Sequence, residues 1–161
     1  MVEIEALPPA QRLILWGDSA VAARAGAALG LALPLAPCRA AENGPRAALS
    51  LGPGEWLLLL PEGDPLNLPA TPPHSLVDVS DACVALVLRG PGAARALSAG
   101  CPLDLHPAAF PPGMATRTVL GRAGITLWRR AAEEWRLEVP RSQAAYARDF
   151  LAEAARGLPD F

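Results

Sequence analysis

The sequence predicts an α+β fold in which two similar β-α-β-β modules share a layered sheet, antiparallel or mixed, with helices packed on it. Each half of the chain contains a short apolar strand, then an Ala-rich helix, then a β-hairpin. A proline-rich stretch separates the halves. At 161 residues the chain can bury a substantial core. We therefore expect a single domain, 1–161, built of two pseudo-repeats (about 11–61 and 76–156) joined by a Pro-rich loop over 62–75.

The first half carries clear local signals. Residues 12–16 form a short apolar strand, and Asp18 or Ser19 can cap the next helix through a side-chain oxygen. Residues 20–29 are Ala-rich and therefore helix-prone, and Gly30 supplies the C-terminal stop. The other element expected in this half is a hairpin over 47–51 and 55–60 that turns at Gly52-Pro53-Gly54.

The second half repeats this order and adds a final helix. A buried strand is expected over 83–88, and Gly90-Pro91 opens a helix that Gly100 closes. The remaining expected elements are a hairpin over 114–120 and 125–129, a strand over 135–139, and a C-terminal helix capped by Ser142 with Ala147, Phe150, Leu151 and Ala154 on one face.

Two tryptophans mark the same place in each half. Glu55-Trp56 begins an apolar run that ends at Pro61, and Glu134-Trp135 begins one that ends at Pro140. These tryptophans are 79 residues apart, whereas the matching helices are 71 apart, so about eight additional residues are expected near the second hairpin. We interpret the echo as an internal duplication. Alternation in the second run predicts Trp135, Leu137 and Val139 inward and Arg136 and Glu138 outward.

Composition excludes several classes of function. A net charge of −2 gives no electrostatic reason to expect nucleic acid or an anionic membrane as partner. Every cationic residue is Arg, which excludes a Schiff-base lysine and a phosphate-loop lysine. Three widely spaced cysteines and the lack of a charged-then-apolar leader predict a cytoplasmic chain, and no apolar run is long enough to cross a bilayer. The 52% hydrophobic content has two explanations, an Ala- and Leu-rich core or a surface that a partner covers.

The sequence contains few candidates for chemistry. Asp104 and His106 are the nearest approach to an acid–base pair, because alternation would place them on one side of an extended segment. No nucleophile stands nearby, so a turn capped by Asp104 explains the pair more simply. His74 and His106 are too few for a three-histidine metal site, and Asp78 with Ser80 fits a turn that follows a strand. We expect no catalytic, cofactor-binding or metal site in this chain.

One stretch of the chain carries a resemblance to a known family. Its centre is Gly100-Cys101-Pro102-Leu103-Asp104-Leu105-His106-Pro107, with Val77-Asp78-Val79-Ser80 and Leu88-Arg89-Gly90-Pro91 upstream and Pro111-Pro112-Gly113-Met114-Ala115-Thr116-Arg117-Thr118 downstream. This order resembles the γ subunit of heterotetrameric sarcosine oxidase. The resemblance implies a fold similar to the N-terminal folate-binding module of the glycine-cleavage aminomethyltransferase.

The resemblance also implies a function. The family's complex demethylates sarcosine oxidatively to glycine, with peroxide and methylene-tetrahydrofolate formation, and this chain would be its non-catalytic accessory γ subunit. FAD, FMN, NAD and tetrahydrofolate are then expected in the partner subunits and no cofactor in this chain. The implied partners are the α subunit, with β and δ in the complex, and a homodimer of the isolated chain is left open.

One departure from the wider group supports the non-catalytic reading. Aminomethyltransferases carry an Asn-Asp pair after the helix that matches residues 91–99, whereas this chain reads Ser98-Ala99-Gly100-Cys101-Pro102 there. The alternatives are a stand-alone folate-binding or aminomethyl-transferring protein and a self-associating scaffold.

The segment from Pro102 to Met114 is the predicted partner interface. It carries Leu103, Leu105, Phe110 and Met114 among several prolines, without a helical or strand period that would bury them internally. Proline lowers the entropy cost of fixing a loop against a partner, and Phe and Met are common at interface centres. We therefore expect these four side chains to lie on or beside the surface that docks on the α subunit.

Overall fold

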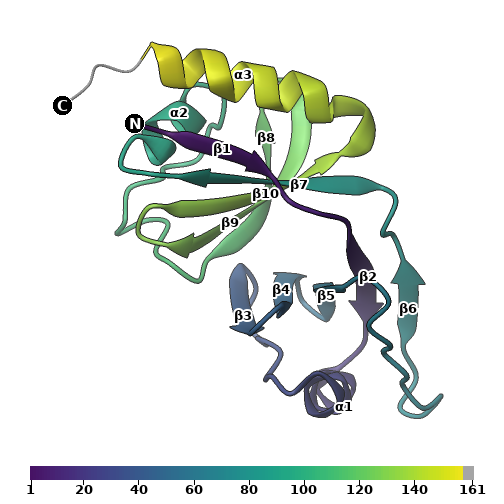
Figure 1. Ribbon diagram of the computed structural model, residues 1–161. Coiled ribbons are helices and arrows are strands. Elements are labelled where there is room, and N and C mark those ends of the chain that lie inside the picture. Colours follow the sequence, from purple (N-terminus) through teal and green to yellow (C-terminus); the bar gives the residue numbers. More distant parts are fainter. Residues whose placement is uncertain (158–161) are drawn as a thin grey trace. The chain divides into compact units, whose positions relative to one another are not determined.

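The computed structural model describes residues 1–157 and confirms the α+β class, with two antiparallel sheets and few helices (Figure 1). The chain forms two compact units, which we name after their buried tryptophans. The Trp56 unit is Pro9–Asp81, and the Trp135 unit is Met1–Pro8 together with the chain from Ala82 onward. The elements are β1 (Glu3–Ala6), β2 (Ala10–Trp16), α1 (Ser19–Leu29), β3 (Arg39–Asn43), β4 (Arg46–Gly52), β5 (Glu55–Pro61), β6 (Ser75–Asp78), β7 (Cys83–Arg89), α2 (Ala93–Ser98), β8 (Ala115–Leu120), β9 (Ala123–Ala131), β10 (Glu134–Pro140), the 3-10 turn η1 (Arg141–Gln143) and α3 (Ala144–Arg156).

The Trp56 unit is a five-stranded antiparallel sheet with one helix on it. Its strand order is β3-β4-β5-β2-β6, and α1 covers one face. Alternate residues of β5 (Trp56, Leu58 and Leu60) meet the apolar side of α1 in a buried core. The Trp56 indole N–H donates a 2.7 Å hydrogen bond to the Pro34 carbonyl, which satisfies the buried polar atom.

Helix α1 forms where its local signals predict it. Asp18 Oδ1 accepts hydrogen bonds from the backbone N–H groups of Ala20 and Val21, at 3.0 and 3.1 Å. Gly30 ends the helix with a φ of +72°, a left-handed conformation that glycine adopts without strain. The predicted hairpin of β4 and β5 is also confirmed.

The Trp135 unit has the equivalent sheet with two helices on one face. Its strand order is β1-β7-β10-β9-β8, all antiparallel, and α2 and α3 pack on the side of Trp135, Leu137 and Val139. These three side chains are fully buried, as alternation predicts. The C-terminal helix also forms, but its N-cap residue is Gln143 and Ser142 lies within η1.

The two sheets match strand for strand. In the Trp56 unit β2 pairs Leu15 with Trp56 and Trp16 with Glu55, and in the Trp135 unit β7 pairs Leu88 with Trp135 and Arg89 with Glu134. The expectation of one shared sheet is wrong, because the strands form two separate five-stranded sheets, one in each unit. The duplication itself stays a prediction, and the matched register is the structural argument for it.

The modules exchange one edge strand each. β1 precedes the first module in the chain but pairs with β7, whereas β6 precedes the second module but pairs with β2. The two edge-strand pairings end at equivalent positions of β7 and β2, with Glu3 opposite Arg89 and Ser75 opposite Trp16. One of the two outer strands of each five-stranded sheet therefore comes from the part of the chain that leads into the other module.

The additional residues of the second half lie between α2 and β8. The chain from α1 to β3 covers residues 30–38, whereas the chain from α2 to β8 covers residues 99–114. This longer connection contains the segment singled out above as a partner interface. No helix within residues 1–157 is long and apolar enough to span a membrane.

Leu58 and Leu137 occupy equivalent positions, each fully buried beneath the helices of its own unit. We expect Leu58→Ala and Leu137→Ala each to lower the free energy of unfolding by about 2–5 kcal/mol, because truncation leaves a cavity. Urea denaturation followed by tryptophan fluorescence measures the change. Val119→Ala at an exposed position is the control, with an expected change of about 0.5 kcal/mol or less. A loss of that small size at Leu58 or Leu137 would contradict the assigned core.

Candidate functional site

The predicted interface residues lie mostly inside the Trp135 unit. Leu105 and Phe110 are only 5% and 1% exposed, and Leu103 and Met114 are half-buried against the same core. The expectation that this segment cannot bury its apolar side chains internally is therefore wrong. Contact of the segment with a partner stays a prediction.

A turn explains how an irregular segment buries two large side chains. The backbone N–H groups of Ala109 and Phe110 both donate to the His106 carbonyl, at 2.9 and 2.8 Å, which reverses the chain. Phe110 then lies against Trp135, with ring centroids 5.3 Å apart. Burial here depends on the turn and not on a repeating period, so periodicity gave no sign of it.

Arg129 on β9 holds the segment in place from inside the unit. This side chain is 5% exposed, and its guanidinium donates to the carbonyls of Phe110 (2.8 Å) and Ala132 (2.6 Å). It also lies over the Trp135 ring, 4.8 Å from the centroid. Sequence reasoning missed this residue, since an arginine in an alternating strand usually indicates a solvent-facing position.

Asp104 and His106 form a turn and not an acid–base pair. Asp104 Oδ1 accepts from the His106 backbone N–H at 2.9 Å, and His106 Nδ1 accepts from the Ala108 backbone N–H at 3.2 Å. The carboxylate therefore bonds to the backbone of His106 and not to its imidazole ring. Both residues are exposed. This geometry agrees with the simpler of the two sequence interpretations.

A second polar cluster lies in the Trp56 unit at the end of β6. Asp78 Oδ1 accepts from the Ser80 hydroxyl (2.6 Å) and the Ser80 backbone N–H (2.9 Å). The Ser80 hydroxyl in turn accepts from the backbone N–H of Arg12 on β2 at 2.9 Å. The hydroxyl bond, followed by the backbone bond, lowers the pKa of Asp78 below its ordinary value of 3.8. The cluster joins the exchanged strand to its neighbour and positions no group for reaction.

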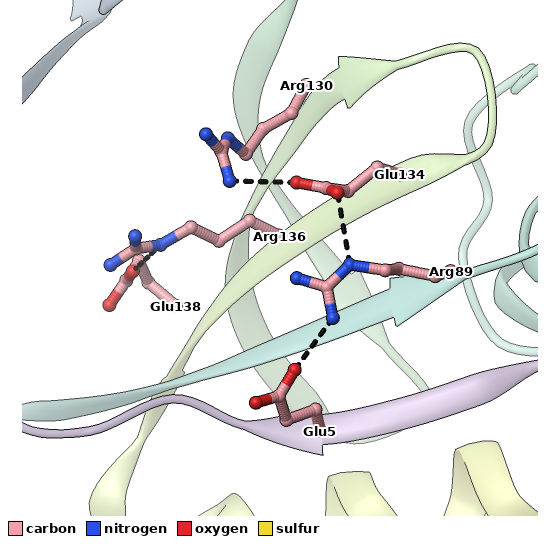
Figure 2. A network of polar contacts seen from close by, with 6 residues as sticks. All are labelled: Glu5, Arg89, Arg130, Glu134, Arg136 and Glu138. Carbon is pink, nitrogen blue, oxygen red and sulfur yellow. Dashed lines mark hydrogen bonds and ion pairs between the residues drawn. The ribbon is translucent and has the colours of Figure 1, made fainter. Parts of the chain in front are cut away.

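Charged side chains form a network across four strands of the Trp135 unit (Figure 2). Arg89 on β7 donates to Glu5 on β1 at 2.7 Å and to Glu134 on β10 at 3.1 Å. Glu134 also accepts from Arg130 on β9 at 2.8 Å. These bonds raise the pKa of Arg89, with Glu5 the larger cause. All these side chains are at least partly exposed, so the network fixes strand order more than it adds stability.

The Arg136–Glu138 pair on β10 corrects a sequence expectation. Both side chains lie on the face opposite Trp135, as alternation predicts, but Glu138 is only 3% exposed and the Arg136 side chain 14%. Their 2.7 Å ion pair is therefore largely buried (Figure 2). Removal of one partner from such a pair is costly, because it leaves an uncompensated charge. The two side chains therefore hold each other in place on this face of the sheet through their opposite charges.

The cysteines and histidines give no sign of a reactive or metal centre. Cys101 is buried, with its Sγ 3.7 Å from the Thr118 hydroxyl, while Cys38 and Cys83 are half-buried. Within residues 1–157, no three His, Cys, Asp or Glu side chains gather closely enough to hold a metal ion.

Comparison with known proteins assigns the family. The model of the sarcosine oxidase, gamma subunit family matches residues 16–156. The chain belongs to this family. A sarcosine oxidase subunit gamma from Arthrobacter sp. is 39% identical over 124 residues, which are 73% of this chain and 61% of that relative. The relative of the same name from Corynebacterium sp. (strain U-96) is 36% identical over 122 residues, or 72% and 59% of the two chains. The chain thus spans about three fifths of these relatives' length.

Solved structures agree with this assignment. A chain of the heterotetrameric sarcosine oxidase from Corynebacterium sp. U-96, in complex with pyrrole 2-carboxylate, matches with a TM-score of 0.85 at 27% identity, covering 99% of this chain and 87% of that one. The glycine cleavage system aminomethyltransferase T from Bartonella henselae matches with a TM-score of 0.70 at 13% identity, covering 96% and 46%. The second similarity concerns the fold alone, and it confirms the predicted similarity in fold to aminomethyltransferase.

Arg129→Met tests the buried anchor of this family member. We expect a loss of about 2–4 kcal/mol in the free energy of unfolding, because the carbonyls of Phe110 and Ala132 lose a charged donor inside the unit. Limited proteolysis should then cut between residues 102 and 114. Arg148→Met, at an exposed arginine, is the matched control, with a change of about 0.5 kcal/mol or less. Equal protease resistance in the wild type and Arg129→Met would contradict the anchoring role.

Asp78→Asn tests the turn beside β6. Since the folded-state pKa of Asp78 is lowered, its stabilising contribution is present above the ordinary value of 3.8 and is lost as pH falls through the folded-state value. The urea midpoint of the wild type should therefore exceed that of Asp78→Asn at about pH 7, and the gap should narrow as pH falls below 3.8. A gap that is constant with pH would show that the carboxylate charge does not stabilise the turn.

Proposed function

We propose that this chain is the non-catalytic γ subunit of a heterotetrameric sarcosine oxidase. The observation that carries the proposal is the family match over residues 16–156, joined to the similarity in fold to a chain of one such complex. In this proposal the complex demethylates sarcosine oxidatively to glycine, with formation of peroxide and methylene-tetrahydrofolate. The γ chain contributes a folded surface to the assembly and no reacting group.

The polar side chains of the described residues support an accessory role. Asp104 and His106 are bonded to the backbone of their own turn, and Asp78 is bonded to Ser80. The charged residues of Figure 2 pair with one another across the sheet. A general acid or base needs a proton-transfer atom directed at a substrate, and each of these groups is instead used to fix the backbone or a strand.

The turn after α2 supplies a more specific argument. Resemblance places a catalytic carboxylate of the aminomethyltransferases in this turn, which here reads Ser98-Ala99-Gly100-Cys101-Pro102 and contains no carboxylate. A Cβ atom at Gly100 would lie 2.6 Å from Cζ of Phe150 and 2.8 Å from the backbone N of Gly121. A side chain at Gly100 would require both Phe150 of α3 and the backbone of Gly121 to shift, so the packing leaves no room for a carboxylate at this position.

The remaining parts of the proposal concern the partners. We infer docking on the α subunit within an assembly that also contains β and δ, in the cytoplasm. FAD, FMN, NAD and tetrahydrofolate would be held by those partner subunits. The rival is a stand-alone folate-binding or aminomethyl-transferring protein, for which the fold similarity to aminomethyltransferase T is the supporting observation.

Expression of the chain alone and with its oxidase subunits tests the proposal. Alone, it should show no flavin absorption, no sarcosine-dependent peroxide and no binding of added tetrahydrofolate in calorimetry. Co-expressed, it should co-purify with an active oxidase, and Asp104→Asn or His106→Gln should change turnover by about twofold or less. A flavin band or peroxide from the isolated chain would overturn the accessory role. Tetrahydrofolate binding by the isolated chain would favour the rival.

A further inference from the structure

The outer face of α1 in the Trp56 unit differs from that of an ordinary surface helix. Its exposed positions include Ala20, Ala23, Ala27 and Ala28, and Arg24 is the only charged residue in the helix. Helix α3 of the same chain provides an internal comparison, because Arg148, Asp149, Glu153 and Arg156 cover its outer face. Apart from Ser19 and Arg24 the exposed positions of α1 are alanines, and a helix that is apolar on nearly all sides is normally buried on most of them. The outer face of α1 thus has the composition of a covered surface.

An apolar groove lies beside this helix. The groove has a volume of about 480 Å³ and is formed by α1 and the chain that follows it, through Ala23, Gly26, Ala27, Leu31 and Leu35. Leu35 is 61% exposed, and it is the one leucine among the exposed large apolar residues of the described chain. Gly26 lets the following chain approach closely, since a Cβ there would lie 2.6 Å from the Leu31 carbonyl oxygen. Packing of the chain against α1 therefore shapes the groove without any charged lining residue.

The charge beside the groove indicates what would cover it. Arg24 lies one helical turn before Ala27, which lines the groove, so its position on the helix borders the groove. It is exposed, and among residues 1–157 the structure gives it no carboxylate partner. By contrast, Arg148 and Arg156 on α3 pair with Asp149 and Glu153. An occupant that buries the groove and also carries a carboxylate opposite Arg24 would complement both features.

We propose that the groove between α1 and Leu35 is the docking surface for an apolar segment of the α subunit that places an Asp or Glu against Arg24. The proposal rests on the proposed function, because it assigns the surface through which the γ chain enters the oxidase. A helical segment suits the groove, since the small side chains of Ala23 and Ala27 let another helix approach closely. The exposed Leu35 side chain supplies the apolar anchor, and Arg24 fixes the orientation of the partner.

Co-purification of tagged γ-chain variants with the co-expressed oxidase subunits tests the surface. Ala27→Glu, Leu35→Asp and Arg24→Glu should each lower the amount of co-purified α subunit by about tenfold or more, whereas Arg24→Lys should retain most of it. All three positions are exposed, so the isolated variants should keep the wild-type circular dichroism and urea midpoint. Ala145→Glu and Arg148→Glu on α3 are matched controls that should co-purify like the wild type.

The outcomes separate this proposal from the proposed function. If the wild-type chain does not co-purify with the oxidase, the proposed function falls and this surface falls with it. If the wild type and all three groove variants co-purify equally, the γ subunit docks elsewhere and only this proposal is overturned. A change confined to self-association of the isolated chain in sedimentation would assign the groove to a second copy, which also overturns the proposal. Equal losses in the α3 controls would show a non-specific effect of added charge and would overturn it as well.

Discussion

The pairing of the first and last strands of each module is the constraint on which the rest of the structure depends. β2 with β5, and β7 with β10, set a register that places Trp56 and Trp135 beneath the helices of their units. Because side chains alternate across a strand, a slip of one residue would move each tryptophan to the opposite face. The free sides of β2 and β7 are then left to accept the exchanged strands β6 and β1.

The two modules share this strand arrangement but differ in the contacts of the buried tryptophan. Trp56 donates its indole hydrogen to the Pro34 carbonyl, in the short connection that follows α1. Trp135 instead contacts Phe110, in the longer connection before β8, and the guanidinium of Arg129, which donates to the Phe110 carbonyl. The additional residues of the second half have therefore become part of its core. In the first half, the shorter connection leaves the groove and Leu35 open beside α1.

The proposed accessory role and the packing are related through α3. Phe150 occupies the space above Gly100, in the turn where the resemblance to aminomethyltransferases would place a carboxylate. The same helix carries its charges outward, in exposed pairs that contribute little to stability. Polar groups elsewhere in the Trp135 unit pair across strands in the network of Figure 2. The charged residues of this unit thus hold its strands in order.

The sequence by itself determined the local elements and the family. The Asp18 cap, the Gly30 stop, both hairpins and the buried alternation from Trp135 follow from interactions between residues close in the chain. Tertiary structure alone decided the exchange of β1 and β6, since two short strands with mostly exposed side chains carry no signal for a distant partner. It also decided the burial of Phe110, Arg129 and Glu138, because these depend on a chain reversal and on contacts that no period in the sequence records.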